Sequence, residues 1–188
     1  MKRFKITKVL SLALAAVFAV SVFTTNASAA SRADQYRREL TTEEVQCLYS
    51  MFDAQFYASA NADVMDYYGF DYYTTDCDMT LFAHFLACGL WEERQPNAQF
   101  NVDVYATRNV DLRAAYGDDI VAYYVHYATH PEEVTWRVTP TLGDAFRNGI
   151  TVYSVYDMVL GSTSAVKTGA LPVQTVNYAP VLGIKYLI

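Results

Sequence analysis

Two histidines with matching surroundings are the first side chains in this sequence that could do chemistry. His84 precedes Cys88 and His126 precedes His130, each at the i, i+4 spacing that puts two side chains on one helix face. A histidine beside a cysteine could activate a nucleophile, and two histidines so spaced could bind zinc. However, no glutamate or third ligand accompanies the histidine pair, and Pro131 follows it directly. We therefore predict no metal site and no cofactor, and we interpret His84 and His126 as structural residues at the edge of the core, hydrogen-bonded to neighbouring loops.

Acidic side chains gather before the expected helices, where they could hold calcium outside a cell. The members of this group are Asp71, Asp76, Asp78, Asp118 and Asp119. The spacing, glycine and glutamate of an EF-hand are absent, and helix capping explains these residues adequately. Because the sequence also lacks a P-loop, a G-x-S-x-G motif and a dinucleotide fingerprint, we predict no catalytic residues. A secreted hydrolase with an unrecognised site is kept as an alternative.

The N-terminal segment, residues 1–29, has the organisation of a secretory signal peptide. Lys2, Arg3, Lys5 and Lys8 precede a short apolar run, and the small residues 27–29 fit a cleavage site. Cleavage removes these four of the 14 Lys and Arg and none of the 20 Asp and Glu, so the net charge falls from −6 to about −10. Such a chain repels nucleic acid and anionic membrane surfaces. We expect a secreted protein, in part associated with the cell surface, with no membrane span after cleavage.

The mature chain repeats itself. FDAQFYASANADVMDYYGFD at 52–71 returns in altered form as FNVDVYATRNVDLRAAYGDD at 100–119. We name residues 52–99 the first copy and residues 100–133 the second copy. The shared positions suit helix caps, helix stops and core aromatics. The residues predicted to have these structural roles are Asp53, Asn61, Gly69, His84, Asn109, Gly117 and His126.

The hydrophobic spacing places these residues on short helices. TTEEVQCLYSMF predicts a helix over 42–51 with a capping box at Thr41 and Glu44. Further helices are expected from Asp53 to residue 60, over 62–68 and over 77–89, with equivalents in the second copy. The loop before the last helix is shorter in the second copy, because Gly117 and His126 lie closer together in the sequence than Gly69 and His84 do.

The repeat resembles one found in secreted and surface proteins of clostridia and related Gram-positive anaerobes. The motif F-D-x-x-F/Y-Y-x-x-x-N-x-D-V/L…G…L-F-x-H-F-L-x-x-G-x-x-E-x-R matches the first copy from Phe52 to Arg94, and the second less completely, without the final Gly and Glu-x-Arg. The resemblance covers about residues 52–133. It implies an extracellular helical repeat module without catalytic residues of its own.

The remaining segments have a different character. Residues 30–40 are predicted to be a flexible leader. Residues 134–188 are rich in Val, Thr, Tyr and Gly, and the stretches ITVYSVYDMVLG and VLGIKYLI are typical of strands. We therefore expect a mainly α fold made of a helical repeat domain, residues 41–133, and a short β-rich or partly ordered C-terminal segment. Overall this is an α+β protein.

The expected function is non-catalytic binding at or outside the cell envelope, to an extracellular protein or a cell-envelope glycan. Tyrosine, present 16 times against two tryptophans, suits such contacts because its ring packs while its hydroxyl stays polar. A structural protein that forms oligomers through its C-terminal strands is a further alternative. The predicted binding residues are Tyr67, Tyr68, Tyr72, Tyr73, Trp91, Tyr123 and Tyr124.

Overall fold

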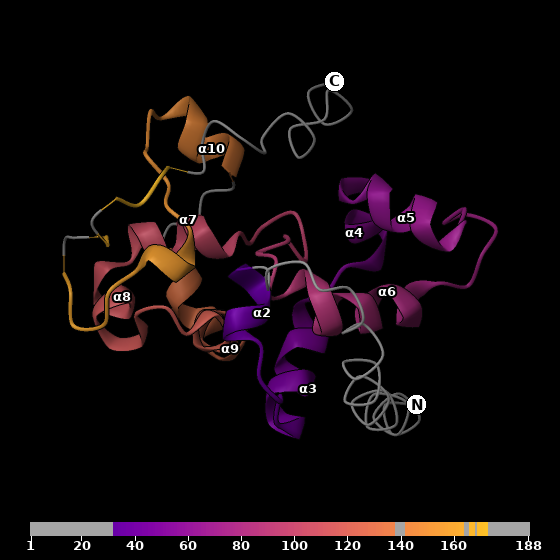
Figure 1. Cartoon of the computed structure of the whole chain (residues 1–188), viewed down its shortest axis with the longest axis horizontal. Coiled ribbons are helices and arrows are strands. Elements are labelled where there is room, and N and C mark those ends of the chain that lie inside the picture. Colours follow the sequence, from indigo (N-terminus) through magenta and orange to yellow (C-terminus); the bar gives the residue numbers. More distant parts are fainter. Residues whose placement is uncertain (1–31, 138–141, 164–165, 168, 173–188) are drawn as a thin grey trace.

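Figure 1 shows the computed structural model of the chain, which describes residues 32–137, 142–163, 166–167 and 169–172. The predicted signal peptide, residues 1–29, lies outside these residues. In this part of the chain no helix has the length and apolar character needed to cross a membrane. The first copy lies on one side of the molecule and the second copy on the other (Figure 1). Helix α3, Thr42–Met51, packs against helix α9, Ile120–Thr129, of the second copy.

Helix α3, Thr42–Met51, confirms the first predicted helix and its capping box. The Thr41 hydroxyl accepts from the backbone N–H of Glu44 at 3.2 Å, and the Glu44 carboxylate accepts from the N–H of Thr41 at 2.8 Å. These two bonds satisfy backbone donors that a helix start leaves open. Val45 and Leu48 of α3 are buried, and the helix packs against α9 of the second copy.

In the first copy, two short helices are confirmed and the third differs from the prediction. Helix α4, Ala54–Ala60, begins at the Asp53 cap, whose carboxylate accepts from Phe56 N at 3.0 Å. Helix α5, Ala62–Tyr68, follows and ends at Gly69, whose φ of 65° lies in the left-handed region. Helix α6, Asp78–His84, then passes into one turn of π-helix, η1, over Phe85–Gly89.

The π turn places Gly89 against Tyr57 of α4. A Cβ at this position would lie 2.1 Å from the hydroxyl oxygen of Tyr57, so only glycine allows the two helices to approach this closely. Leu90 N donates to Phe85 O at 2.7 Å, the i to i+5 bond of a π turn. The predicted helix 77–89 is therefore two elements, and its N-cap is Cys77, without a side-chain cap from Asp76 or Asp78.

The second copy repeats this order. Helix α7, Val102–Arg108, is capped by Asn101, and helix α8, Val110–Tyr116, follows it. Helix α9, Ile120–Thr129, is capped by Asp119. A 3₁₀ turn, η2 (Pro131–Thr135), follows α9 and begins at Pro131, which has no N–H to continue the helix.

One core joins the two copies, and its rings repeat as the sequence does. Phe52 lies 5.2 Å from Tyr57 between ring centroids, and Phe100 lies 5.3 Å from Tyr105. Tyr124 of α9 contacts both Phe100, at 4.9 Å, and Phe85 of the first copy, at 5.9 Å. The copies therefore bury each other's apolar faces, as stacked repeats do.

The predicted β-rich C-terminal segment is wrong for the residues that the structure describes. Residues 142–147 form a short helix, α10 (Leu142–Arg147), and ITVYSVYDMVLG contains a 3₁₀ turn, η3 (Val155–Asp157). Across the described ranges the segment forms only isolated bridges, Tyr153 with Pro172 and Met158 with Val166, and no strand. VLGIKYLI, at residues 181–188, lies outside the described residues. The described fold is helical.

Strands are absent from this described part of the segment because the helical copies take its backbone hydrogen bonds. Val155 N donates to the Asp103 carboxylate at 2.8 Å, Tyr153 N to the Thr107 hydroxyl at 3.2 Å, and Gly161 N to a carbonyl of α8 at 2.8 Å. Its apolar residues Val155, Tyr156 and Met158 are at the same time buried in the core. A backbone satisfied in this way has no need of a β ladder.

Part of the predicted leader forms a short helix that packs on the C-terminal segment. Helix α2, Arg32–Tyr36, buries Ala33. The Tyr36 ring stacks on that of Tyr156 with centroids 4.1 Å apart. Lys167 donates to Asp118 at 3.0 Å and to Tyr156 O at 2.9 Å, and so ties the segment to the second copy. The described ends of the chain therefore contact each other over the second copy.

Candidate functional site

A tyrosine and a histidine that the two copies share form the same pair twice. The Tyr57 hydroxyl is 3.0 Å from His84 Nδ1, and the Tyr105 hydroxyl is 2.9 Å from His126 Nδ1. Each histidine therefore bonds to a helix tyrosine rather than to a loop. Burial lowers the pKa of both histidines, with Arg94 adding to the effect at His84 and His130 at His126. Both rings are neutral structural groups near pH 7.

In each copy an arginine side chain donates to a buried asparagine and to an aspartate, and we call this group the arginine clamp. Arg94 donates to Asn61 Oδ1 at 2.9 Å and binds the Asp63 carboxylate with two bonds of 2.9 and 2.7 Å. Each asparagine also donates its amide to the tyrosine carbonyl one turn earlier, at 2.8 Å from Asn61 and 2.9 Å from Asn109. The clamp thereby fixes the junction between the two short helices.

Arg137 supplies the same clamp to the second copy. It donates to Asn109 Oδ1 at 3.1 Å and to the two Asp111 carboxylate oxygens at 2.9 and 2.6 Å. Arg137 Nε also donates to Glu133 Oε2 at 2.6 Å, as Arg94 Nε donates to Glu92 in the first copy. The sequence pattern misses this arginine, because the spacing from its glutamate is longer than in the first copy. The predicted domain end at residue 133 falls inside this clamp.

The side chains that could do metal or nucleophile chemistry are occupied with packing. His130 stacks on His126 with centroids 4.4 Å apart, and Glu133 lies 3.5 Å from His126 Nε2. Cys47, Cys77 and Cys88 are free thiols, and burial raises the pKa of Cys88. In the described ranges no three His, Cys, Asp or Glu side chains are grouped to hold a metal ion.

Three of the predicted binding residues belong to the core. Tyr123 and Tyr124 are fully buried and Trp91 is 2% exposed. The Tyr123 hydroxyl donates to Gly117 O at 2.6 Å, the Tyr124 hydroxyl to Arg94 O at 3.2 Å, and Trp91 Nε1 to Leu86 O at 3.0 Å. Their polar atoms hold the repeat together, so these residues offer nothing to a ligand in solution.

The other four predicted binding residues lie in the first copy, on α5 and the loop that follows it. Tyr67 is 71% exposed and Tyr73 is 85% exposed, whereas Tyr68 and Tyr72 are half-buried beside them. Tyr68 stacks on Phe70, with centroids 5.2 Å apart and the rings 14° from parallel. We call Tyr67, Tyr68, Phe70, Tyr72 and Tyr73 the tyrosine surface.

The loop that carries the tyrosine surface has a defined conformation. Gly69 turns the chain with its left-handed φ, and nothing lies within 4 Å of where its Cβ would be. The Asp71 carboxylate accepts from Tyr73 N at 3.0 Å, and Asp71 O accepts from Thr75 N at 2.8 Å. These bonds form a tight turn of the kind that Asp favours. The tyrosines are therefore presented by ordered backbone.

In the second copy the C-terminal segment covers the position equivalent to Gly69. Gly117, the counterpart of Gly69, lies so close to Leu160 that a Cβ would come within 2.8 Å of its backbone nitrogen. Arg113 of α8 donates to Thr163 O at 3.1 Å. The glycine position is thus covered in the second copy and open in the first, whereas Ala115, the counterpart of Tyr67, is exposed in the second copy too.

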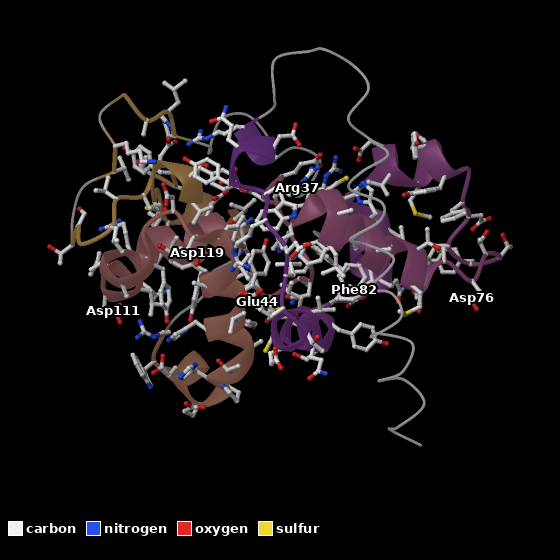
Figure 2. All side chains as sticks on the ribbon, turned by 60° about the horizontal axis from the view of Figure 1, so that its bottom comes forward. Arg37, Glu44, Asp76, Phe82, Asp111 and Asp119 are labelled. Atoms are coloured by element: carbon white, nitrogen blue, oxygen red, sulfur yellow. The ribbon has the colours of Figure 1, made fainter. Side chains whose placement is uncertain are left out.

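The part of the first copy that carries the tyrosine surface is acidic. Residues 53–80 contain six aspartates and neither Lys nor Arg. Asp66, Asp71 and Asp76 are exposed around the tyrosine surface. Figure 2 shows Asp76 at the outer end of this loop, across the molecule from Asp111 of the second copy.

A groove of about 440 Å³ between the copies is a weaker candidate. The Asn97 amide in its wall donates to Met51 O at 2.7 Å and accepts from two backbone N–H groups. The Asp53 carboxylate caps α4. Because these polar groups already have structural partners, the groove offers few groups for recognition.

No family model, curated protein or solved structure matches this chain. The resemblance to the clostridial repeat therefore stays a prediction.

Proposed function

We propose that this protein is a secreted, non-catalytic binding module that recognises an extracellular protein through the tyrosine surface. The observation that carries this proposal is the difference between the copies: the first displays Tyr67 and Tyr73, which are 71% and 85% exposed, where the second has the small Ala115 and a shorter loop. Exposed aromatic clusters on ordered backbone are costly to leave in water unless a partner uses them.

The chemistry of this surface favours a basic protein over an anionic wall polymer. Tyrosine gives large contact area at low entropic cost and is enriched where proteins bind each other. The aspartates around the rings attract Lys and Arg side chains, which also bind aromatic faces. The same aspartates repel anionic polymers. A glycan ligand is the alternative outcome of the test.

Binding assays with matched variants of the mature protein test this proposal. Immobilised protein is incubated with purified extracellular proteins of graded charge and, separately, with purified peptidoglycan. Tyr67→Ala/Tyr73→Ala removes the two exposed rings, and Trp136→Ala, which removes an exposed aromatic elsewhere (62% exposed), is the control.

We expect retention of basic proteins that weakens with salt and is lost in the double variant but not in the control. Equal retention by the double variant would refute the tyrosine surface as the site. Retention by peptidoglycan alone would identify a glycan-binding module instead.

A further inference from the structure

The C-terminal segment lies along α7 in an extended conformation and is bonded to it through its backbone. Tyr153 N donates to the Thr107 hydroxyl at 3.2 Å, and Val155 N donates to the Asp103 carboxylate at 2.8 Å. Ser154 between them is extended, with φ −55° and ψ 140°. Alternate N–H groups of the segment thereby meet two acceptors that are one helical turn apart on α7.

The same segment continues past the end of α8. Gly161 N donates to Ala114 O at 2.8 Å, and a Cβ on Gly117 would come within 2.8 Å of Leu160 N. Figure 1 shows the segment, in orange and yellow, beside α7 and α8. A copy of this repeat can therefore hold an extended chain by main-chain groups, which every residue of that chain except proline supplies.

The first copy presents the corresponding positions of its two short helices to solvent. Gln55 and Ser59 of α4 stand where Asp103 and Thr107 stand on α7, and both are exposed. The amide oxygen of glutamine and the hydroxyl of serine accept N–H bonds, as aspartate and threonine do. Within the described part of the chain, nothing lies within 4 Å of where a Cβ of Gly69 would be, so this turn leaves room for a chain to pass. We call this group the α4–α5 surface, and its members are Gln55, Ser59, Asp66 and Gly69.

Charge decides which kind of chain suits the α4–α5 surface. In the second copy, Lys167 of the bound segment lies 3.0 Å from the Asp118 carboxylate, just beyond α8. The first copy has only acidic charges over residues 53–80, and Asp66 and Asp71 are exposed beside and beyond α5. Lys and Arg side chains on a bound chain would therefore meet carboxylates here as well. Another copy of this protein is a poorer occupant, because its net charge is itself −6.

We propose that the first copy binds an extended, basic segment of its protein partner along α4 and α5, in the way that its own C-terminal segment lies along α7 and α8. This inference rests on the proposed function and specifies the form of the partner. Gln55 and Ser59 accept two alternate N–H groups of the bound segment, and the aspartates meet its Lys and Arg side chains. Gly69 lies between Tyr68 and Phe70, so the tyrosine surface adjoins the end of the α4–α5 surface.

Binding of this kind selects a loop or a terminus of the partner over its folded interior. The backbone N–H groups of a folded domain are paired within its own helices and sheets, except at sheet edges. An extended segment keeps these groups available, and its main-chain bonds supply affinity while side-chain contacts supply specificity. The charge of the segment and its free N–H groups are therefore the two features to vary in a test.

Fluorescence anisotropy of the full mature chain with a synthetic peptide tests the inference directly. The probe has the sequence of residues 150–167 with Asp157→Lys, which makes it basic while it keeps the backbone that the second copy holds. The control peptide has the same side chains and charge but carries N-methyl groups at Tyr153 and Val155, which remove the two N–H donors. Because only the peptide changes, this comparison does not depend on the folding of any variant.

A matched pair of variants locates the binding on α4. Gln55→Ala/Ser59→Ala removes both acceptors, and Gln46→Ala/Ser50→Ala on α3 is the control, since it removes the same two exposed residue types at the same spacing. The Ser59 and Ser50 hydroxyls each also donate to the carbonyl three residues earlier, at 2.7 Å in both cases. The two variants therefore lose the same local bond, and circular dichroism checks that both remain folded.

We expect the basic peptide to bind the wild type and the α3 control equally, and to bind Gln55→Ala/Ser59→Ala about tenfold more weakly, the effect of two modest hydrogen bonds. The N-methylated peptide should show a similar loss on the wild type. Absence of peptide binding, equal binding of the two peptides, or full binding by Gln55→Ala/Ser59→Ala would each overturn the inference.

The proposed function fails separately from this inference. Full binding of the peptide by Tyr67→Ala/Tyr73→Ala, with the N–H dependence intact, would support the extended segment and refute the tyrosines as the recognition surface. Retention of basic proteins that is lost in Tyr67→Ala/Tyr73→Ala and unchanged in Gln55→Ala/Ser59→Ala would support the tyrosine surface and overturn the extended segment.

Discussion

Comparing the variants Arg94→Met and Asp63→Asn separates the two contributions that the Arg94 clamp makes to the free energy of unfolding. The arginine donates to the Asn61 carbonyl oxygen and forms a two-bond ion pair with Asp63. Methionine keeps much of the apolar stem but removes every donor. The variant therefore breaks both interactions at once, and Asp63→Asn breaks only the ion pair.

Burial decides which contribution dominates. The Asp63 side chain is 63% exposed, and an ion pair so solvated stabilises by at most about 1 kcal/mol. Asn61 is 7% exposed, and a buried acceptor left without its donor costs about 1–3 kcal/mol. We expect Arg94→Met to lower the free energy of unfolding by about 2–3 kcal/mol, and Asp63→Asn to lower it by less than about 1 kcal/mol.

Urea denaturation of the mature protein, followed by far-UV circular dichroism, measures both values. The same pair of changes at Arg137 and Asp111 is an internal replicate, because the second clamp has the same geometry. Equal losses for Arg94→Met and Asp63→Asn would show that the ion pair, and not the buried asparagine, carries the stabilisation. A loss below about 0.5 kcal/mol for Arg94→Met, no larger than that of an ordinary surface substitution, would refute the clamp itself.

Two further predictions concern the packing and titration of the repeat. Gly89→Ala should destabilise by about 1–3 kcal/mol in chemical denaturation, because the new methyl group displaces the buried Tyr57 hydroxyl, whereas Gly69→Ala should cost about 1 kcal/mol from its left-handed φ alone. His84 and His126 have lowered pKa values in the fold, so the unfolded chain binds protons more readily. Their contribution to stability should be present above about pH 6.5 and lost as the pH falls through that value. Urea denaturation from pH 7.5 to 5.5 compares the wild type with His84→Gln/His126→Gln, and equal pH slopes in the two would contradict this.

Much of the helical repeat could be predicted from the sequence because its signals are local. The Thr41 capping box, the Asp53 cap and the Gly69 stop each act within one turn of the residue that encodes them. The four tyrosines at positions 67, 68, 72 and 73 lie in and beside the loop whose length the copies do not share, and their role in binding stays a prediction.

Much of what the sequence does not predict depends on contacts distant in the chain. Val155 and its neighbours have the composition of a strand, but their backbone bonds go to Asp103, 52 positions earlier. Arg137 is separated from Asn109 by 28 positions, so its clamp cannot be recognised by spacing alone. Trp91, predicted to bind a ligand, is buried, and Tyr156 of the C-terminal segment donates to its carbonyl oxygen at 2.6 Å.

The central claim, that the exposed tyrosines of the first copy are the recognition surface, is tested most directly by a nitration footprint. Mass spectrometry of the mature protein after brief nitration should find Tyr67 and Tyr73 modified first and Tyr123 and Tyr124 unmodified. Addition of a retained basic protein should protect Tyr67 and Tyr73. Unchanged nitration of both residues in the complex, or protection of Tyr153 on the C-terminal segment instead, would contradict the account.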